Sequence, residues 1–158
     1  MANPVLKPRP RTITPHFTLF IQDYDSPDPS DTQTFIINPG PYRLPFGTSK
    51  RWDIERSVDE VRVKADVTVF WSGPKVTDPV RAEVNMFLFE GASSSTTDLD
   101  GMLQNQEFTL LGKGKTTHAY GSTNPEYSYS VWSIAEYDVN TPLSRRDHAE
   151  LFIALDEA

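Results

Sequence analysis

The sequence predicts an all-β domain: an antiparallel β-sandwich of about seven or eight strands, with a closed β-barrel as the alternative. Three observations support this fold class. Apolar and polar residues alternate over residues 61–71, thirteen prolines separate short apolar segments, and no long segment shows convincing helical periodicity. Short strands divided by turn-rich connections are typical of sandwiches and barrels.

The composition limits the kinds of partner and chemistry. A chain of 158 residues is long enough for one domain with a substantial core. Its 22 acidic and 15 basic residues give a net charge of −7, which argues against nucleic acid and anionic membrane surfaces as partners. The absence of cysteine excludes disulfides and thiolate metal sites. With no apolar leader or membrane span, we expect a soluble protein, cytoplasmic or secreted with its leader absent from this chain.

The N-terminal segment is rich in proline and basic residues. Pro4, Pro8, Pro10 and Pro15 predict an extended arm over residues 1–15, followed by a single β domain over residues 16–158. An arm of this kind can pair with a neighbouring subunit, so a homo-oligomer is one expected assembly, and a frayed terminus is the alternative.

The strand candidates in the first half of the chain are residues 13–24, 34–38, 52–58 and 61–71. The last of these is the clearest, because apolar and polar residues fall on odd-numbered and even-numbered positions, which point to opposite faces of a strand. One face carries Val61, Val63, Ala65, Val67, Val69 and Trp71, and the other carries Arg62, Lys64, Asp66 and Thr68. This pattern predicts a strand with one face in a core and one face in water.

The second half of the chain continues the pattern. Residues 81–90 alternate in the same way until their polar face becomes aromatic at Phe87 and Phe89. Gly73, Pro74 and Pro79 precede them, so residues 61–71 and 81–90 are expected to form an antiparallel hairpin with a long loop. Further candidates are residues 107–111 and 127–137.

The C-terminal segment, residues 147–156, is compatible with a strand or a helix. Ser144 and Asp147 form a capping pattern that favours a helix. The alternation of Ala149, Leu151 and Ile153, together with the β character of the preceding chain, favours a strand, and a strand is our prediction.

Two acidic segments are candidates for a calcium site. Asp98, Asp100 and Glu107 occupy spacings of a twelve-residue calcium loop, but Thr96 stands where the first aspartate belongs, and no helices flank the segment. The second segment, residues 23–31, contains Asp23 and Asp25. If the loops meet at one end of a sandwich, Asp23, Asp25, Asp98 and Asp100 can bind calcium; ordinary solvated turns are the alternative.

The paired Asp-x-Asp sequences, at residues 23–25 and 98–100, resemble those of calcium-binding C2 domains. The resemblance implies a C2-like sandwich, and a jelly-roll sandwich is the other type that we expect. The resemblance covers two short segments, and no residue role is transferred from that family.

Aromatic residues make up 11% of the chain and supply the candidate ligand contacts. Tyr42, Trp52, Tyr120 and Tyr127 lie where a strand or loop is expected to face water. Flat rings beside Asn, Asp and Arg are used by sugar-binding surfaces and by protein interfaces. The alternative is that these rings belong to a large core.

No motif assigns a catalytic residue. The segment GKGKTT at residues 112–117 lacks the first glycine of a phosphate-binding loop, the three histidines are isolated, and no G-x-S-x-G elbow is present. We therefore expect a non-catalytic binding module directed to a carbohydrate or protein surface, stabilised by calcium. The alternative is a small β-barrel around an apolar ligand, such as a cyclase or isomerase, with apolar residues on both faces at Phe87, Phe89, Trp132 and Ile134.

Overall fold

A computed structural model describes residues 8–24, 31–91, 99–110, 116–117, 130–135, 142 and 145–158, with the backbone alone for 116–117 and 130–135. These residues form ten strands: β1 (Arg11–Asp23), β2 (Asp31–Ile37), β3 (Tyr42–Leu44), β4 (Thr48–Val58), β5 (Val61–Trp71), β6 (Arg81–Glu90), β7 (Leu99–Thr109), β8 (Thr116–Thr117), β9 (Ser130–Ala135) and β10 (His148–Glu157). The C-terminal segment is thus a strand, as predicted. In this described part, no helix is long and apolar enough to cross a bilayer.

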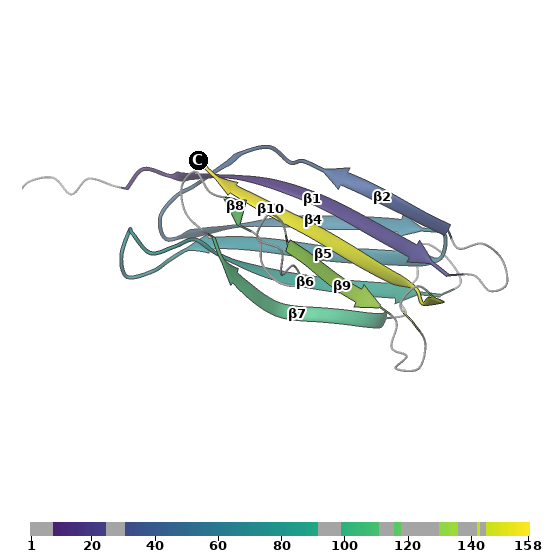
Figure 1. The fold of residues 1–158 in the computed structure, drawn as a ribbon. Helices are drawn as coiled ribbons and strands as arrows, with labels where there is room; N and C mark the ends of the chain where they lie inside the picture. Colours follow the sequence, from purple (N-terminus) through teal and green to yellow (C-terminus); the bar gives the residue numbers. More distant parts are fainter. Residues whose placement is uncertain are drawn as a thin grey trace, which may run out of the picture.

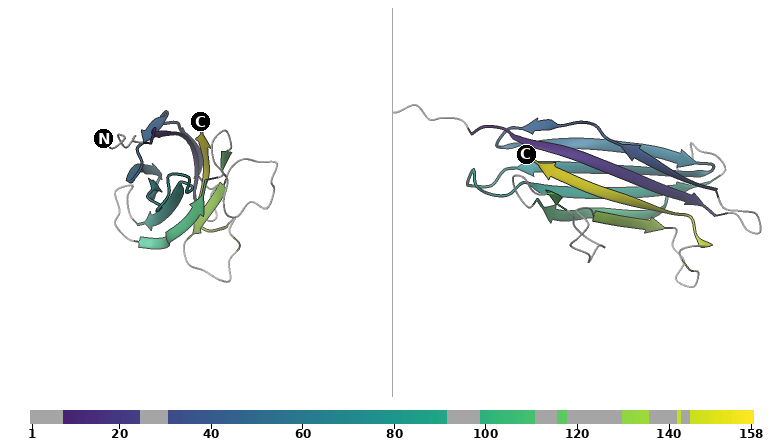
Figure 2. Two further views of the ribbon diagram at one scale, coloured as in Figure 1. Left: turned by 90° about the vertical axis from the view of Figure 1, so that its left-hand side faces the viewer. Right: turned by 45° about the horizontal axis from the view of Figure 1, so that its top comes forward.

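The strands divide into two antiparallel sheets. Sheet A has the order β2-β1-β10-β8, with β3 also beside β1 and β9 also beside β10, and sheet B has the order β4-β5-β6-β7. Figures 1 and 2 show β1 and β10 in one layer and β4 to β7 in the other. The closed β-barrel alternative is wrong, because the strands form two separate sheets with edge strands.

The two sheets share one hydrophobic core. Alternate residues of β1, β5, β6 and β10 point between the layers, as the period of a strand requires. The fully buried residues include Phe17, Leu19, Ile21, Val63, Val67, Val69, Val84, Met86, Leu88, Leu151, Ile153 and Leu155. Removal of this apolar surface from water is the main stabilising contribution to the fold. The predicted hairpin is confirmed, since β5 and β6 pair from Val61↔Glu90 to Phe70↔Arg81.

A tight turn carries the chain from sheet A to sheet B. Thr48 N donates to Pro45 O at 3.2 Å, which closes a four-residue turn between β3 and β4. Gly47 lies at the third position with φ of 82°, a conformation that a residue with a Cβ rarely adopts. The chain then enters β4, whose inner face carries Trp52 and Ile54.

The first strand starts earlier than the predicted domain boundary at residue 16. Residues 11–15 belong to β1, and Ile13 is fully buried. β1 pairs with β10 from Ile13↔Glu157 to Gln22↔His148, so the N-terminal and C-terminal strands are neighbours in the middle of sheet A. Residues 1–7 of the expected arm lie outside the described residues.

The segment expected to contain a calcium loop is largely a strand. β7 begins at Leu99, so Asp100, Gly101 and Glu107 lie in an extended edge strand rather than a compact loop. Its pairing with β6 contains two register shifts, one of them between Val84 and Met86. Near that shift Asn105 adopts a φ of 57°, and its N–H donates to the side-chain oxygen of Asn85 at 2.9 Å.

Candidate functional site

Two of the four predicted aromatic contact residues are in the described chain, and they contact each other. Trp52 is only 8% exposed and packs edge-to-face against Phe17 of β1, with ring centroids 6.2 Å apart. Tyr42 is half-buried, and its ring centroid is 6.4 Å from that of Trp52. Lys50 Nζ lies 5.2 Å from the Tyr42 ring centroid. Trp52 is therefore a core residue that joins the two sheets. Tyr120 and Tyr127 lie outside the described residues.

The acidic candidates are placed in part. Asp23 is buried at the end of β1, and one of its carboxylate oxygens accepts the Glu60 N–H at 3.2 Å. Glu60 is in the β4–β5 turn, next to Val61, which pairs with Glu90 at the end of β6. The adjacent Phe89 pairs with Leu99, the first residue of β7. The end of β1 and the start of β7, with Asp100, therefore lie at the same end of the molecule, as Figure 1 shows. Asp25 and Asp98 lie outside the described residues. No group of three or more potential metal ligands occurs within the described ranges.

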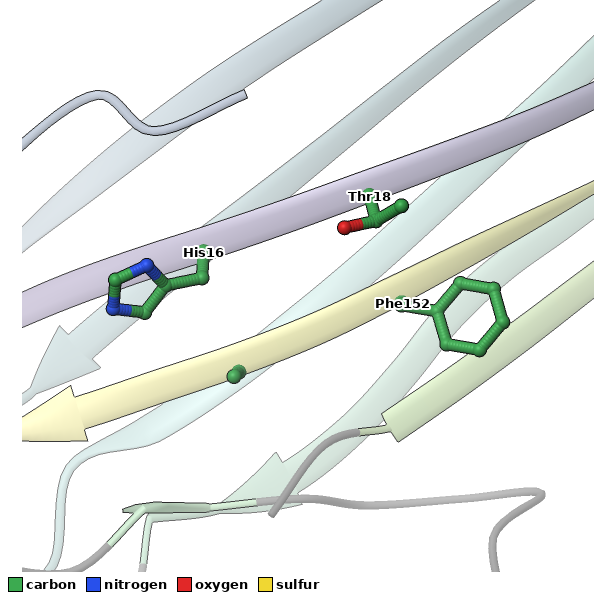
Figure 3. Close-up of a pocket in the computed structure, with 4 residues that line it drawn as sticks. His16, Thr18 and Phe152 are labelled. Carbon is green, nitrogen blue, oxygen red and sulfur yellow. The ribbon is translucent and has the colours of Figure 1, made fainter. Parts of the chain in front are cut away.

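A groove of about 280 Å³ lies on the outer face of sheet A. The described residues that line it are His16 and Thr18 of β1 and Phe152 and Ala154 of β10 (Figure 3). They form two neighbouring cross-strand pairs, His16↔Ala154 and Thr18↔Phe152. Because Ala154 carries only a methyl group, the surface is low beside the larger His16 and Phe152 rings. Among the described lining residues, Ala154 is thus the low point between larger side chains on one sheet face.

His16 is held in position by polar side chains on both of its ring nitrogens. Nε2 lies 3.1 Å from Asp156 Oδ2, and because a carboxylate can only accept, Nε2–H donates to it. Nδ1 lies 3.2 Å from Asn38 Oδ1. The ring therefore forms a fixed polar wall at one end of the groove. With both nitrogens engaged, it is poorly placed to act as a general base.

The outer face of sheet B carries a second hollow of about 270 Å³, near Phe87. Three of its charged residues form ion pairs: Arg51 Nε donates to Asp53 at 2.8 Å, and Arg51 Nη2 lies 3.4 Å from Asp66 Oδ2. The hydrogen bond with Asp53, followed by the charges of Asp66 and Asp53, raises the pKa of Arg51. The sheet A groove is the candidate binding site, because it places the aromatic ring of Phe152 opposite Thr18.

The aromatic residues of this second face also have partners. Arg62 Cζ lies 4.7 Å from the Phe89 centroid, and Arg81 Cζ lies 5.6 Å from the Phe70 centroid. At the Phe89 end of this face, Leu99 and Met102, which pair with Phe89 and Phe87, are 43% and 55% exposed. This face is therefore apolar at one end and rich in cation–π contacts.

The groove residues were not among the sequence-predicted contacts. Alternation places Phe17 and Leu151 inside, so His16, Thr18 and Phe152 are expected outside by parity alone. What parity cannot supply is the register of β1 against β10, which brings His16 opposite Ala154 across 137 intervening residues. No family model, curated protein or solved structure matches this chain, so the functional inference rests on its own geometry.

Proposed function

We propose that the chain is a non-catalytic β-sandwich binding module that binds a neutral carbohydrate in the sheet A groove. The observation that carries the proposal is an aromatic ring, Phe152, next to the Thr18 hydroxyl and the fixed imidazole of His16. A flat apolar ring can contact the C–H face of a sugar, and the Thr18 hydroxyl can bind a sugar hydroxyl. The His16 ring, with both nitrogens engaged, forms the wall at the end of the groove.

The charge and size of the site support this class of ligand. Asp156 lies at the groove's polar end, and the chain carries a net charge of −7, so a neutral ligand is favoured over an anion. A volume of about 280 Å³ is close to the lower limit of roughly 300 Å³ for small-molecule sites. The groove therefore suits one small ligand or the end of a longer saccharide.

The sandwich architecture itself, of jelly-roll or C2-like type, is part of the proposal. It is supported by the core that the two antiparallel sheets share and by the β3–β4 turn, which crosses between them. A rigid pair of sheets holds the groove residues without any need for a preceding conformational change.

Replacing Phe152 by alanine is expected to weaken carbohydrate binding about tenfold or more, because the ring supplies the apolar contact surface. The measurement is affinity electrophoresis and titration calorimetry against a panel of neutral polysaccharides and their oligosaccharides. Phe70→Ala, on the outer face of sheet B, is the matched control and should bind like the wild type.

A second variant tests the groove without removing a ring. Ala154→Leu fills the low point between His16 and Phe152 and should block binding while the fold is kept. Wild-type protein that binds none of the panel contradicts the carbohydrate proposal.

A protein surface is the second candidate ligand, favoured by the exposed apolar side chains of Leu99 and Met102 on sheet B. Protein binding that survives both groove variants but is lost in Met102→Asp would assign the function to sheet B.

We also propose that calcium stabilises the module through Asp23, Asp25, Asp98 and Asp100, supported by the common end at which Asp23 and Asp100 lie. Saturating calcium should raise the melting temperature by about 5–10 °C relative to chelator, because a ligand bound to the folded state stabilises it. Asp100→Asn should reduce the shift, and Asp53→Asn, on the exposed edge of β4, should not. Equal melting temperatures with calcium and chelator would remove calcium from the proposal.

A further inference from the structure

β2 forms an exposed edge of sheet A. Along its outer side, no described strand pairs with it, so alternate backbone N–H and C=O groups point away from β1. Residues 31–34 are exposed at every position, and Ile36 is 73% exposed. An edge of this kind is a template for another strand.

The two edge strands of sheet B carry features that oppose such pairing. On β4, Lys50 and Arg56 share the parity of the buried Trp52 and Ile54, and they lie over the rings of Tyr42 and Phe35. Inward charged residues at an edge disfavour a further strand. On β7, two register shifts interrupt the regular ladder.

β2 has neither kind of protection. Its sequence, DTQTFII, contains no lysine, arginine or proline, and its pairing with β1 is regular from Phe17↔Ile37 to Asp23↔Asp31. Its only charged residue, Asp31, stands at the first position. Threonine, isoleucine and phenylalanine are residues that suit pairing between strands.

We propose that β2 pairs antiparallel with β2 of a second copy of this chain about a twofold axis at Thr34, which joins the two A sheets into one. In this register Thr34 faces Thr34, Gln33 faces Phe35, and Thr32 faces Ile36 of the copy. A closed twofold contact of this kind uses the same surface on both chains.

The occupant is a second copy because β2 is complementary to itself. All seven residues find partners in the twofold register. Despite the net charge of −7, this pairing opposes no like charges, since Asp31 faces Ile37 of the copy. Pairing also covers Ile36, the most exposed of the large apolar residues in the described chain. The inference is independent of the carbohydrate groove.

Sedimentation velocity of the full chain over a range of concentrations tests the proposal. The wild type should show a concentration-dependent dimer. Thr34→Lys and Thr34→Asp each place two like charges opposite each other at the axis, so each should raise the dimer dissociation constant severalfold. An equimolar mixture of the two variants should dimerise again as a heterodimer. Met102→Lys and Met102→Asp, on sheet B, are the matched controls and should behave like the wild type.

The absence of cysteine permits a second, position-specific measurement. Thr34→Cys places two thiols directly opposite each other, about 4.5–5.5 Å apart at Cβ, close to disulfide reach. It should cross-link under mild oxidation much faster than Gln33→Cys, whose counterpart is two residues away. A monomeric wild type, a dimer unaffected by charge at residue 34, or equal cross-linking of the two variants would each overturn the proposal.

Discussion

Replacing Trp52 by alanine is expected to lower the free energy of unfolding by about 3–5 kcal/mol. Trp52 is 8% exposed, and its ring contacts Phe17 of sheet A and Tyr42 of the strand that precedes the sheet crossing. The substitution leaves a cavity between the layers and removes two edge-to-face ring contacts. Urea denaturation monitored by circular dichroism measures the change, and the slope with denaturant should stay close to that of the wild type.

Met102→Ala is the control, because Met102 is 55% exposed on the outer face of sheet B and its loss should cost no more than about 0.5 kcal/mol. If Trp52→Ala proved as stable as Met102→Ala and instead lost ligand binding, Trp52 would be a contact residue, as its surroundings in the sequence suggested. The pair of variants thus separates a structural ring from a recognition ring.

The sequence already contained the information that Trp52 is buried. Trp52, Ile54 and Val58 share one parity, and the exposed Arg51, Asp53 and Glu55 share the other. The prediction of a surface ring rested on polar neighbours along the chain. In a strand those neighbours point to the opposite face, so parity is the stronger guide.

β7 shows where the alternation signal ends. Residues 99–107 are mostly polar and include Gly101 and Asn105, which are typical of turns. At a sheet edge a strand can nevertheless form, because the backbone bonds to β6 do not depend on side-chain pattern. The register shifts absorb the irregular residues, and the sequence alone therefore resembled a loop.

The groove illustrates a different limit. Local alternation predicts which residues of β1 and β10 point outward, but the groove depends on which of them are opposite each other. That register is set by the whole folded sheet, through pairs such as Thr18↔Phe152.

The N-terminus also depends on a pairing that local sequence does not reveal. The prolines in residues 1–15 predicted an extended arm, whereas in the fold Arg11 donates to Glu157 of the C-terminal strand.

Replacing Arg11 by alanine is expected to cost about 3–5 kcal/mol of stability, because it leaves a buried carboxylate without its cation. The Glu157 side chain is 1% exposed, and Arg11 Nε donates to it. Arg11 also donates to Asp78 O at 2.9 Å, and its guanidinium lies 5.1 Å from the Trp71 ring. One side chain thus ties the start of β1 to the end of β10 and to the β5–β6 loop. Thermal and urea denaturation of the variant measure the loss.

Two comparisons show whether the buried charge is the cause. Arg81→Ala breaks a surface pair, since Arg81 and Glu107 are 51% and 44% exposed, and should cost at most about 1 kcal/mol. The double variant Arg11→Met with Glu157→Gln removes both charges and should recover much of the stability lost in Arg11→Ala. If the double variant were as unstable as the single one, packing of the Arg11 stem and its backbone contact would account for the loss. In that case the ion pair would contribute little, and the first strand would be held by its ladder with β10.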